Sequence, residues 1–155
     1  MLKALGKNFT LKHVERAARL LCKAGIPVIW YFLFGGPGEN ETTVRETFSF
    51  IEENIPKRDL VFITSGIRIL PGSPLHVYAR NIGQLPDGTD ILKPFWFQPE
   101  GINKETMLYM INREVISHGN YINLQDNTDE SVLALTLKRV YSFLGLLYEE
   151  MLFIG

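Results

Sequence analysis

The sequence is poor in the residues that build disulfide frameworks and metal centres. Among its 155 residues Cys22 is the one cysteine, which excludes an internal disulfide and any site that needs several thiolates from this chain. The three histidines, His13, His76 and His118, are far apart and match no ligand spacing. We therefore predict no metal site, and we expect Cys22 to be a small core residue rather than a reactive thiol.

An excess of charge is also missing. Sixteen Lys and Arg residues face seventeen Asp and Glu residues, for a net charge of −1, so no strong field would attract nucleic acid or an anionic membrane. The first residues lack the apolar core of a signal peptide. The apolar stretch 132–154 contains Lys138, Arg139, Glu149 and Glu150, too many charges for a spanning helix. We expect a soluble, cytoplasmic protein without nucleic-acid or membrane partners.

What the sequence does have is an apolar run that ends in a glycine turn. The run from Val28 to Phe34 is followed by Gly35-Gly36-Pro37-Gly38-Glu39. A continuous apolar run of this length indicates a parallel strand covered on both faces. Glycines after such a strand let a ligand approach the main chain, and the next helix then points its N–H groups at the ligand. This turn is the first candidate for a functional site.

Helical and strand patterns alternate along the first half of the chain. Thr10, Asn40 and Gly25 suit the helix-capping positions around two of the helices. The order is typical of parallel strands joined by right-handed crossovers. We predict strands over 28–34 and 60–70, and helices over 11–24, 41–54, 75–82, 104–117 and 130–150.

Two strands are too few for five helices, because two parallel strands buried on both faces are not a stable sheet. We therefore expect that strands are missing from the chain or come from a partner. An open sheet edge invites association, so we also expect homo-oligomers. We divide the chain into an α/β part, 1–83, and a loop plus helical extension packed on it, 84–155.

Four motifs occur in an order that resembles the second half of a radical S-adenosylmethionine (SAM) domain. They are 2–10 (LKALGKNFT), 24–27 (AGIP), 34–39 (FGGPGE) and 66–75 (GIRILPGSPL). The likeness is strongest to the Fe-S oxidoreductase branch that is often fused to a cobalamin-binding domain. The resemblance implies an α/β fold, a partial (half) TIM-like barrel with parallel strands, followed by a helical C-terminal extension.

The same resemblance implies chemistry that this chain cannot perform alone. In the family a 4Fe-4S cluster on a CxxxCxxC loop reduces SAM to methionine and a 5′-deoxyadenosyl radical, sometimes with cobalamin. That loop is absent here. We therefore expect a fragment of a radical SAM enzyme that is inactive by itself. Its partner would be the missing N-terminal part of the barrel, its substrate a small molecule, and its catalytic residues stay unidentified.

The resemblance also carries candidate site residues. It implies that Arg68 and the turn lie at the SAM pocket, the turn residues being Phe34, Gly35, Gly36, Pro37, Gly38 and Glu39. It assigns a possible substrate contact to Pro71, Gly72 and Ser73. Each has a plainer interpretation: the glycines only make a tight turn, Glu39 is a first-turn carboxylate favoured by the helix dipole, Arg68 pairs with an acidic residue, and the later turn is structural.

Two other functions stay open. The turn could belong to a nucleotide-binding or small-molecule-binding α/β module without redox chemistry, although it lacks the Lys-Ser/Thr of a P-loop and does not match G-x-G-x-x-G. The chain could also be an assembly module that pairs through its sheet edge. The cluster Phe95-Trp96-Phe97 could stack a base, but we expect it to pack back on the core.

Overall fold

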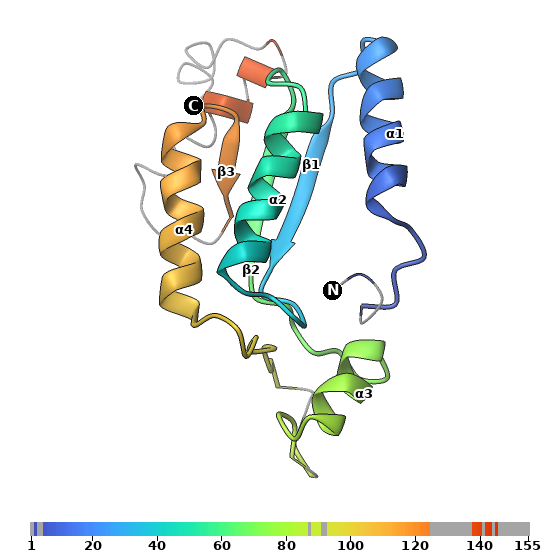
Figure 1. Cartoon of the computed structure of the whole chain (residues 1–155), viewed down its shortest axis with the longest axis vertical. Coiled ribbons are helices and arrows are strands. Elements are labelled where there is room, and N and C mark those ends of the chain that lie inside the picture. Colours follow the sequence, from blue (N-terminus) through green and yellow to red (C-terminus); the bar gives the residue numbers. More distant parts are fainter. Residues whose placement is uncertain are drawn as a thin grey trace, which may run out of the picture.

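The computed structural model describes residues 2, 5–86, 88–90, 93–124, 138–140, 142, 143 and 145. Within this part of the chain the strands β1 (Ile29–Phe34), β2 (Leu60–Ser65) and β3 (Tyr121–Asn123) form one open sheet in the order β1-β2-β3. Both neighbouring pairs are parallel. The strands point toward one end of the molecule, where the short helix α3 (Pro74–Asn81) lies (Figure 1).

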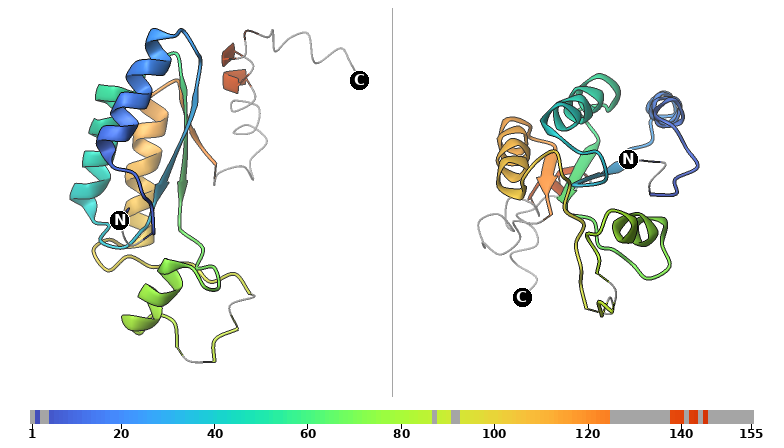
Figure 2. Two further views of the ribbon diagram at one scale, coloured as in Figure 1. Left: turned by 90° about the vertical axis from the view of Figure 1, so that its right-hand side faces the viewer. Right: turned by 60° about the horizontal axis from the view of Figure 1, so that its bottom comes forward.

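The three longer helices cover one face of the sheet. These helices are α1 (Leu11–Lys23), α2 (Glu41–Asn54) and α4 (Lys104–Ser117), and Figure 2 shows them on the same side when the sheet is seen edge-on. Strands that follow one another in chain order, with their crossover helices on one face, have the winding of a β/α barrel rather than of a doubly wound sheet. The predicted α/β fold, part of a TIM-like barrel with parallel strands, is confirmed.

Local sequence signals set the helix ends. The Asn40 side chain accepts a hydrogen bond from the Thr43 N–H at 3.1 Å at the start of α2. Asn103 does the same for the Thr106 N–H at 2.8 Å at the start of α4. Gly25 follows α1 with φ +73°, a left-handed conformation that suits glycine after a helix. These caps explain why α1, α2 and α4 begin and end within a residue or so of their predicted bounds.

Alternate residues of β1 differ in burial. Trp30, Phe32 and Phe34 point to the helices and pack in the main core, whereas Tyr31 on the other face is 64% exposed. The prediction that this strand is covered on both faces is therefore wrong within the described part of the chain. The main core is built from the following buried residues: Ala18, Phe34, Val44, Phe48, Ile51, Ile55, Val61, Ile63, Ile102, Met107, Ile111 and Tyr121.

The sheet differs from prediction in two places. The strand predicted over 60–70 ends at Ser65 because Gly66 turns the chain with φ +88°. Arg68 therefore lies beyond β2 and forms an isolated antiparallel bridge with Trp96. The strand β3 was not predicted, because three residues are too few for a periodic pattern and they become a strand by pairing with β2.

The helix α1 is less buried than its apolar pattern predicts. Ala18 is its one buried residue, Leu11 is 55% exposed, and Cys22 is exposed. The expectation of Cys22 as a core residue is thus wrong. The predicted helix over 130–150 lies largely outside the described residues. Within this range, residues 138–140, 142 and 143 are described and helical. No helix in the described part of the chain is both long and apolar enough to cross a membrane.

Candidate functional site

The glycine turn after β1 is closed by its own carboxylate. Glu39 is only 4% exposed. Its Oε2 accepts a hydrogen bond from the Gly35 N–H at 3.1 Å, and its Oε1 accepts one from the Thr43 hydroxyl at 2.5 Å. The Glu39 N–H in turn donates to the Gly36 carbonyl at 3.1 Å. The polar groups of the turn are therefore largely used within it.

Gly35 is required by two independent constraints. Its φ is +89°, and a Cβ at this position would stand 3.1 Å from the Gly66 nitrogen and 3.4 Å from the Met107 methyl group. The Gly66 N–H also donates to the Phe34 carbonyl at 2.9 Å. The turn is thus packed directly against the end of β2 and the first turns of α4.

A cleft of about 310 Å³ lies on the other side of these same residues. It opens at the carboxyl end of β2, the end at which β/α barrels place their active sites. Gly66 and Met107 separate it from the Gly35 turn. Its lining consists of Ser65, Gly66, Trp96, Phe97, Gln98, Pro99, Lys104 and Met107.

The outer wall of the cleft is a short two-stranded ladder. The Ile69 N–H donates to the Phe95 carbonyl at 2.8 Å, and the Phe97 N–H donates to the Ile67 carbonyl at 2.9 Å. This pairing buries Phe97 to 3% exposure and leaves the intervening Trp96 at 49%. The Phe95-Trp96-Phe97 cluster packs back on the protein through its phenylalanines, as predicted, while its tryptophan is presented at the cleft.

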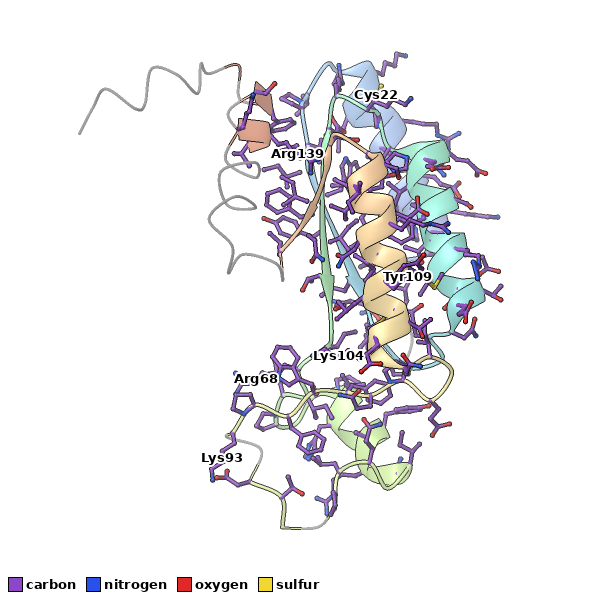
Figure 3. The ribbon with its side chains drawn as sticks, turned by 90° about the vertical axis from the view of Figure 1, so that its left-hand side faces the viewer. Cys22, Arg68, Lys93, Lys104, Tyr109 and Arg139 are labelled. Atoms are coloured by element: carbon purple, nitrogen blue, oxygen red, sulfur yellow. The ribbon has the colours of Figure 1, made fainter. Side chains whose placement is uncertain are left out.

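Among the described residues that line the cleft, Lys104 is the cation. Lys104 is the first residue of α4, whose amino end carries the partial positive charge of the helix dipole. Figure 3 shows Lys104 and Arg68 at the same end of the sheet, with Cys22 and Arg139 at the other. An aromatic ring and a cation around one hollow suit a flat ligand that carries an anionic group.

The predicted site residues lie behind or outside this cleft. The Phe34 ring is fully buried and stacks on Phe48 with ring centroids 5.1 Å apart. Gly35, Gly36 and Pro37 are buried, and Gly38 is exposed with φ +79°. None of the ten predicted residues is among the described residues that line the cleft, so their contact with a ligand stays a prediction.

The second predicted turn has a structural use. The Ser73 hydroxyl accepts a hydrogen bond from the His76 N–H at 3.1 Å, which caps α3, and donates to the Leu70 carbonyl at 2.8 Å. Pro71 and Gly72 are exposed. Sequence reasoning missed Trp96, Gln98 and Lys104 as cleft residues, and the one local signal was the aromatic cluster between two prolines.

A wider hollow of about 890 Å³ lies at the opposite end of the sheet. Arg58 and Arg139 line it, but each cross-links the fold: Arg58 Nη2 donates to the Cys22 carbonyl at 3.2 Å, and Arg139 Nη1 donates to the Tyr121 carbonyl. Burial lowers the pKa of Arg139. Since barrel chemistry belongs to the carboxyl ends of the strands, the smaller cleft is the candidate site.

Comparison with known proteins gives a likeness to a solved structure. No family model matches the chain, and no curated protein matches it. Among solved structures, the radical S-adenosylmethionine methyltransferase TsrM from Kitasatospora setae, with cobalamin and a [4Fe-4S] cluster bound, is 23% identical with a TM-score of 0.42. The match covers 66% of this chain and 19% of TsrM. The chain spans about a fifth of the TsrM length.

Proposed function

We propose that this chain is the C-terminal part of a radical SAM barrel and that its cleft is one wall of the SAM and substrate pocket. The proposal rests on the position of the cleft, which lies at the carboxyl end of β2 and back to back with the Gly35 turn. The ordered motifs of the sequence support the same assignment. The parent enzyme would cleave SAM reductively, and a small molecule would be its substrate.

The cleft suits part of SAM. Its volume of about 310 Å³ is at the lower limit of ligand pockets, which hold about 300–1,000 Å³, so the rest of the ligand would be covered by the remainder of the barrel. The half-exposed Trp96 ring would stack on the adenine. The Lys104 ammonium would pair with the carboxylate of the methionine moiety.

This chain lacks the cysteine thiolates that would hold the 4Fe-4S cluster. Its single cysteine, Cys22, is exposed in the last turn of α1, at the end of the sheet away from the cleft (Figure 3). One thiolate does not fit a cluster held by three or four. The reduction of SAM is therefore assigned to the parent enzyme, and cobalamin to a further domain of it, with no step taken by Cys22.

The bare face of β1 would be completed by the missing N-terminal part of the barrel. Ile29, Tyr31 and Leu33 are 37%, 64% and 44% exposed on that face, and β1 is an edge of the described sheet. Without the missing part, we expect copies of this chain to associate through the face. Light scattering should give a mass above one chain that L33K lowers and the exposed-helix control L20K does not. A monomer at every concentration would contradict this.

Ligand titration tests the pocket. In a W30F background, which leaves Trp96 as the one tryptophan, SAM should quench the fluorescence. K104Q should weaken the binding of SAM at least fivefold. It should leave the affinity for methylthioadenosine unchanged, because that molecule lacks the carboxylate. W96L should abolish the binding of both molecules, as measured by calorimetry.

The alternative is a non-redox nucleotide-binding module, which the lack of cluster ligands favours. Tighter binding of ATP or GTP than of SAM would establish it and overturn the proposal. Anaerobic reconstitution with iron and sulfide should yield no cluster absorbance and no SAM cleavage. Either signal from this chain alone would contradict its assignment as an inactive fragment.

A further inference from the structure

Two helices bring three metal-ligating side chains together on the outer face of the molecule. Glu52 lies in the last turn of α2, while Glu114 and His118 lie at the end of α4. One donor atom from each residue lies within 4.8 Å of the other two. These helix ends are remote from the cleft, because the helices run antiparallel to the strands (Figure 1).

The His118 ring is held in one orientation. Its Nδ1 lies 2.9 Å from the Glu114 backbone carbonyl and 3.1 Å from the Ser117 hydroxyl, and a hydrogen bond to the carbonyl places the proton on Nδ1. The ring also stacks on Tyr121 with centroids 4.4 Å apart and planes 15° apart. These two contacts fix where Nε2 points.

Nε2 points at a carboxylate. It lies 3.1 Å from Glu52 Oε1, and in the neutral ring both of these atoms are acceptors. A cation that lies between these two atoms could take a lone pair from each of them. Glu114 adds a second carboxylate, whose Oε2 lies 3.9 Å from His118 Nδ1. The nearby cation, Arg113, is 66% exposed and lies 3.3 Å from Glu114 Oε1.

We propose that Glu52, Glu114 and His118 bind a divalent transition-metal ion of the Zn²⁺ type, which ties α2 to α4. Donors about 2.0–2.1 Å from a tetrahedral ion stand about 3.3 Å apart, close to the 3.1 Å between Nε2 and Oε1. A ring whose other nitrogen donates to a backbone carbonyl is the usual state of a metal-bound histidine. Water would take the fourth position. The proposed site differs from the prediction of no metal site. That prediction relied on ligand spacing along the sequence, whereas these ligands come from separate helices.

Metal titration of the untagged, full-length C22S chain tests the site, since C22S removes the exposed thiol. Calorimetry should give one Zn²⁺ per chain, and Co²⁺ should give the visible absorption of a four-coordinate ion. Mg²⁺ and Ca²⁺, which prefer all-oxygen sites, should not compete. Zn²⁺ in hundredfold excess over its Kd should raise Tm by several degrees.

Matched variants locate the ligands. E52Q changes an exposed side chain and should weaken Zn²⁺ binding at least tenfold, while circular dichroism should show an unchanged fold. E114Q should have the same effect. H118Q should abolish Zn²⁺ binding. E53Q and H76Q carry the same substitutions outside the site and should bind as C22S does. An equal loss of Zn²⁺ affinity in E53Q or H76Q would overturn the proposal. So would NMR spectra in which the His118 ring signals do not change when Zn²⁺ is added. Neither result bears on SAM binding, so the two proposals fail separately.

Discussion

The Gly35–Glu39 turn and the cleft share Gly66 and Met107 as a common wall, yet they treat their polar groups in opposite ways. The turn is closed, and its buried carboxylate is used to bind its own backbone. The cleft is open, with Trp96 half-exposed and Lys104 at its rim. The difference teaches that a conspicuous glycine motif can be the support of a site whose ligand-facing groups come from other segments.

The largest expected effect concerns Phe34, a predicted ligand contact that the structure places in the core. F34A should lower the free energy of unfolding by about 3–5 kcal/mol, because it removes a fully buried ring stacked on Phe48. F9A, at a 44% exposed position, should cost less than about 1 kcal/mol. Urea unfolding measures both. A small loss in F34A would mean that the ring faces a ligand site after all.

Local chemistry explains which parts of the fold were predictable. Asn40 starts α2 and Gly25 ends α1 through contacts with residues nearby in the chain. The strand β3 and the exposed side of α1 were missed, because they depend on what lies next to them in space. Leu11 has the spacing of a buried residue, but it is 55% exposed in the described structure.

The next effect tests the contact between the turn and β2. G35A should cost about 3 kcal/mol, since it adds the strain of a left-handed alanine to a 3.1 Å contact with the Gly66 nitrogen. G38A has similar strain, with φ +79°, but nothing within 4 Å of its Cβ. It should cost about 1 kcal/mol. Equal losses in thermal unfolding would show that the turn does not lean on β2.

A smaller effect tests whether Glu39 serves the turn. E39Q should cost about 1–3 kcal/mol, because a buried carboxylate that accepts from Gly35 and Thr43 loses its charge-assisted bonds. E41Q removes an exposed ion pair with Arg45 and should cost about 0.5 kcal/mol or less. If Glu39 instead binds a ligand, E39Q would keep its stability and lose SAM binding, which reverses the comparison.

The cleft was less predictable than the turn, for a physical reason. Its lining comes from the end of β2, the segment 96–99 and the start of α4, and about thirty residues of chain separate β2 from the other two parts. They meet through the bridge between Arg68 and Trp96. No local pattern encodes such a bridge, so the sequence indicated the support of the site and not its open side.

The smallest expected effect on stability concerns the outer wall of the cleft, which few bonds hold in place. The Gln84 side chain accepts from the Gln98 N–H at 2.9 Å and donates to the Gln98 carbonyl at 2.7 Å, both in an exposed setting. Q84A should therefore cost only about 1 kcal/mol in global stability. Hydrogen exchange at the Gln98 amide should nevertheless rise clearly, because local opening needs only this wall to move.

Q98A is the matched control, since it removes a side chain and leaves both of these backbone bonds to Gln84 intact. Its amide should exchange as in the unchanged chain. If Q84A instead slowed or left exchange unaltered, the wall would be held by the Phe97 side of the ladder alone, and the cleft would be as rigid as the turn. Faster exchange confined to this segment would show that the wall of the cleft opens more readily than the Gly35–Glu39 turn that supports it.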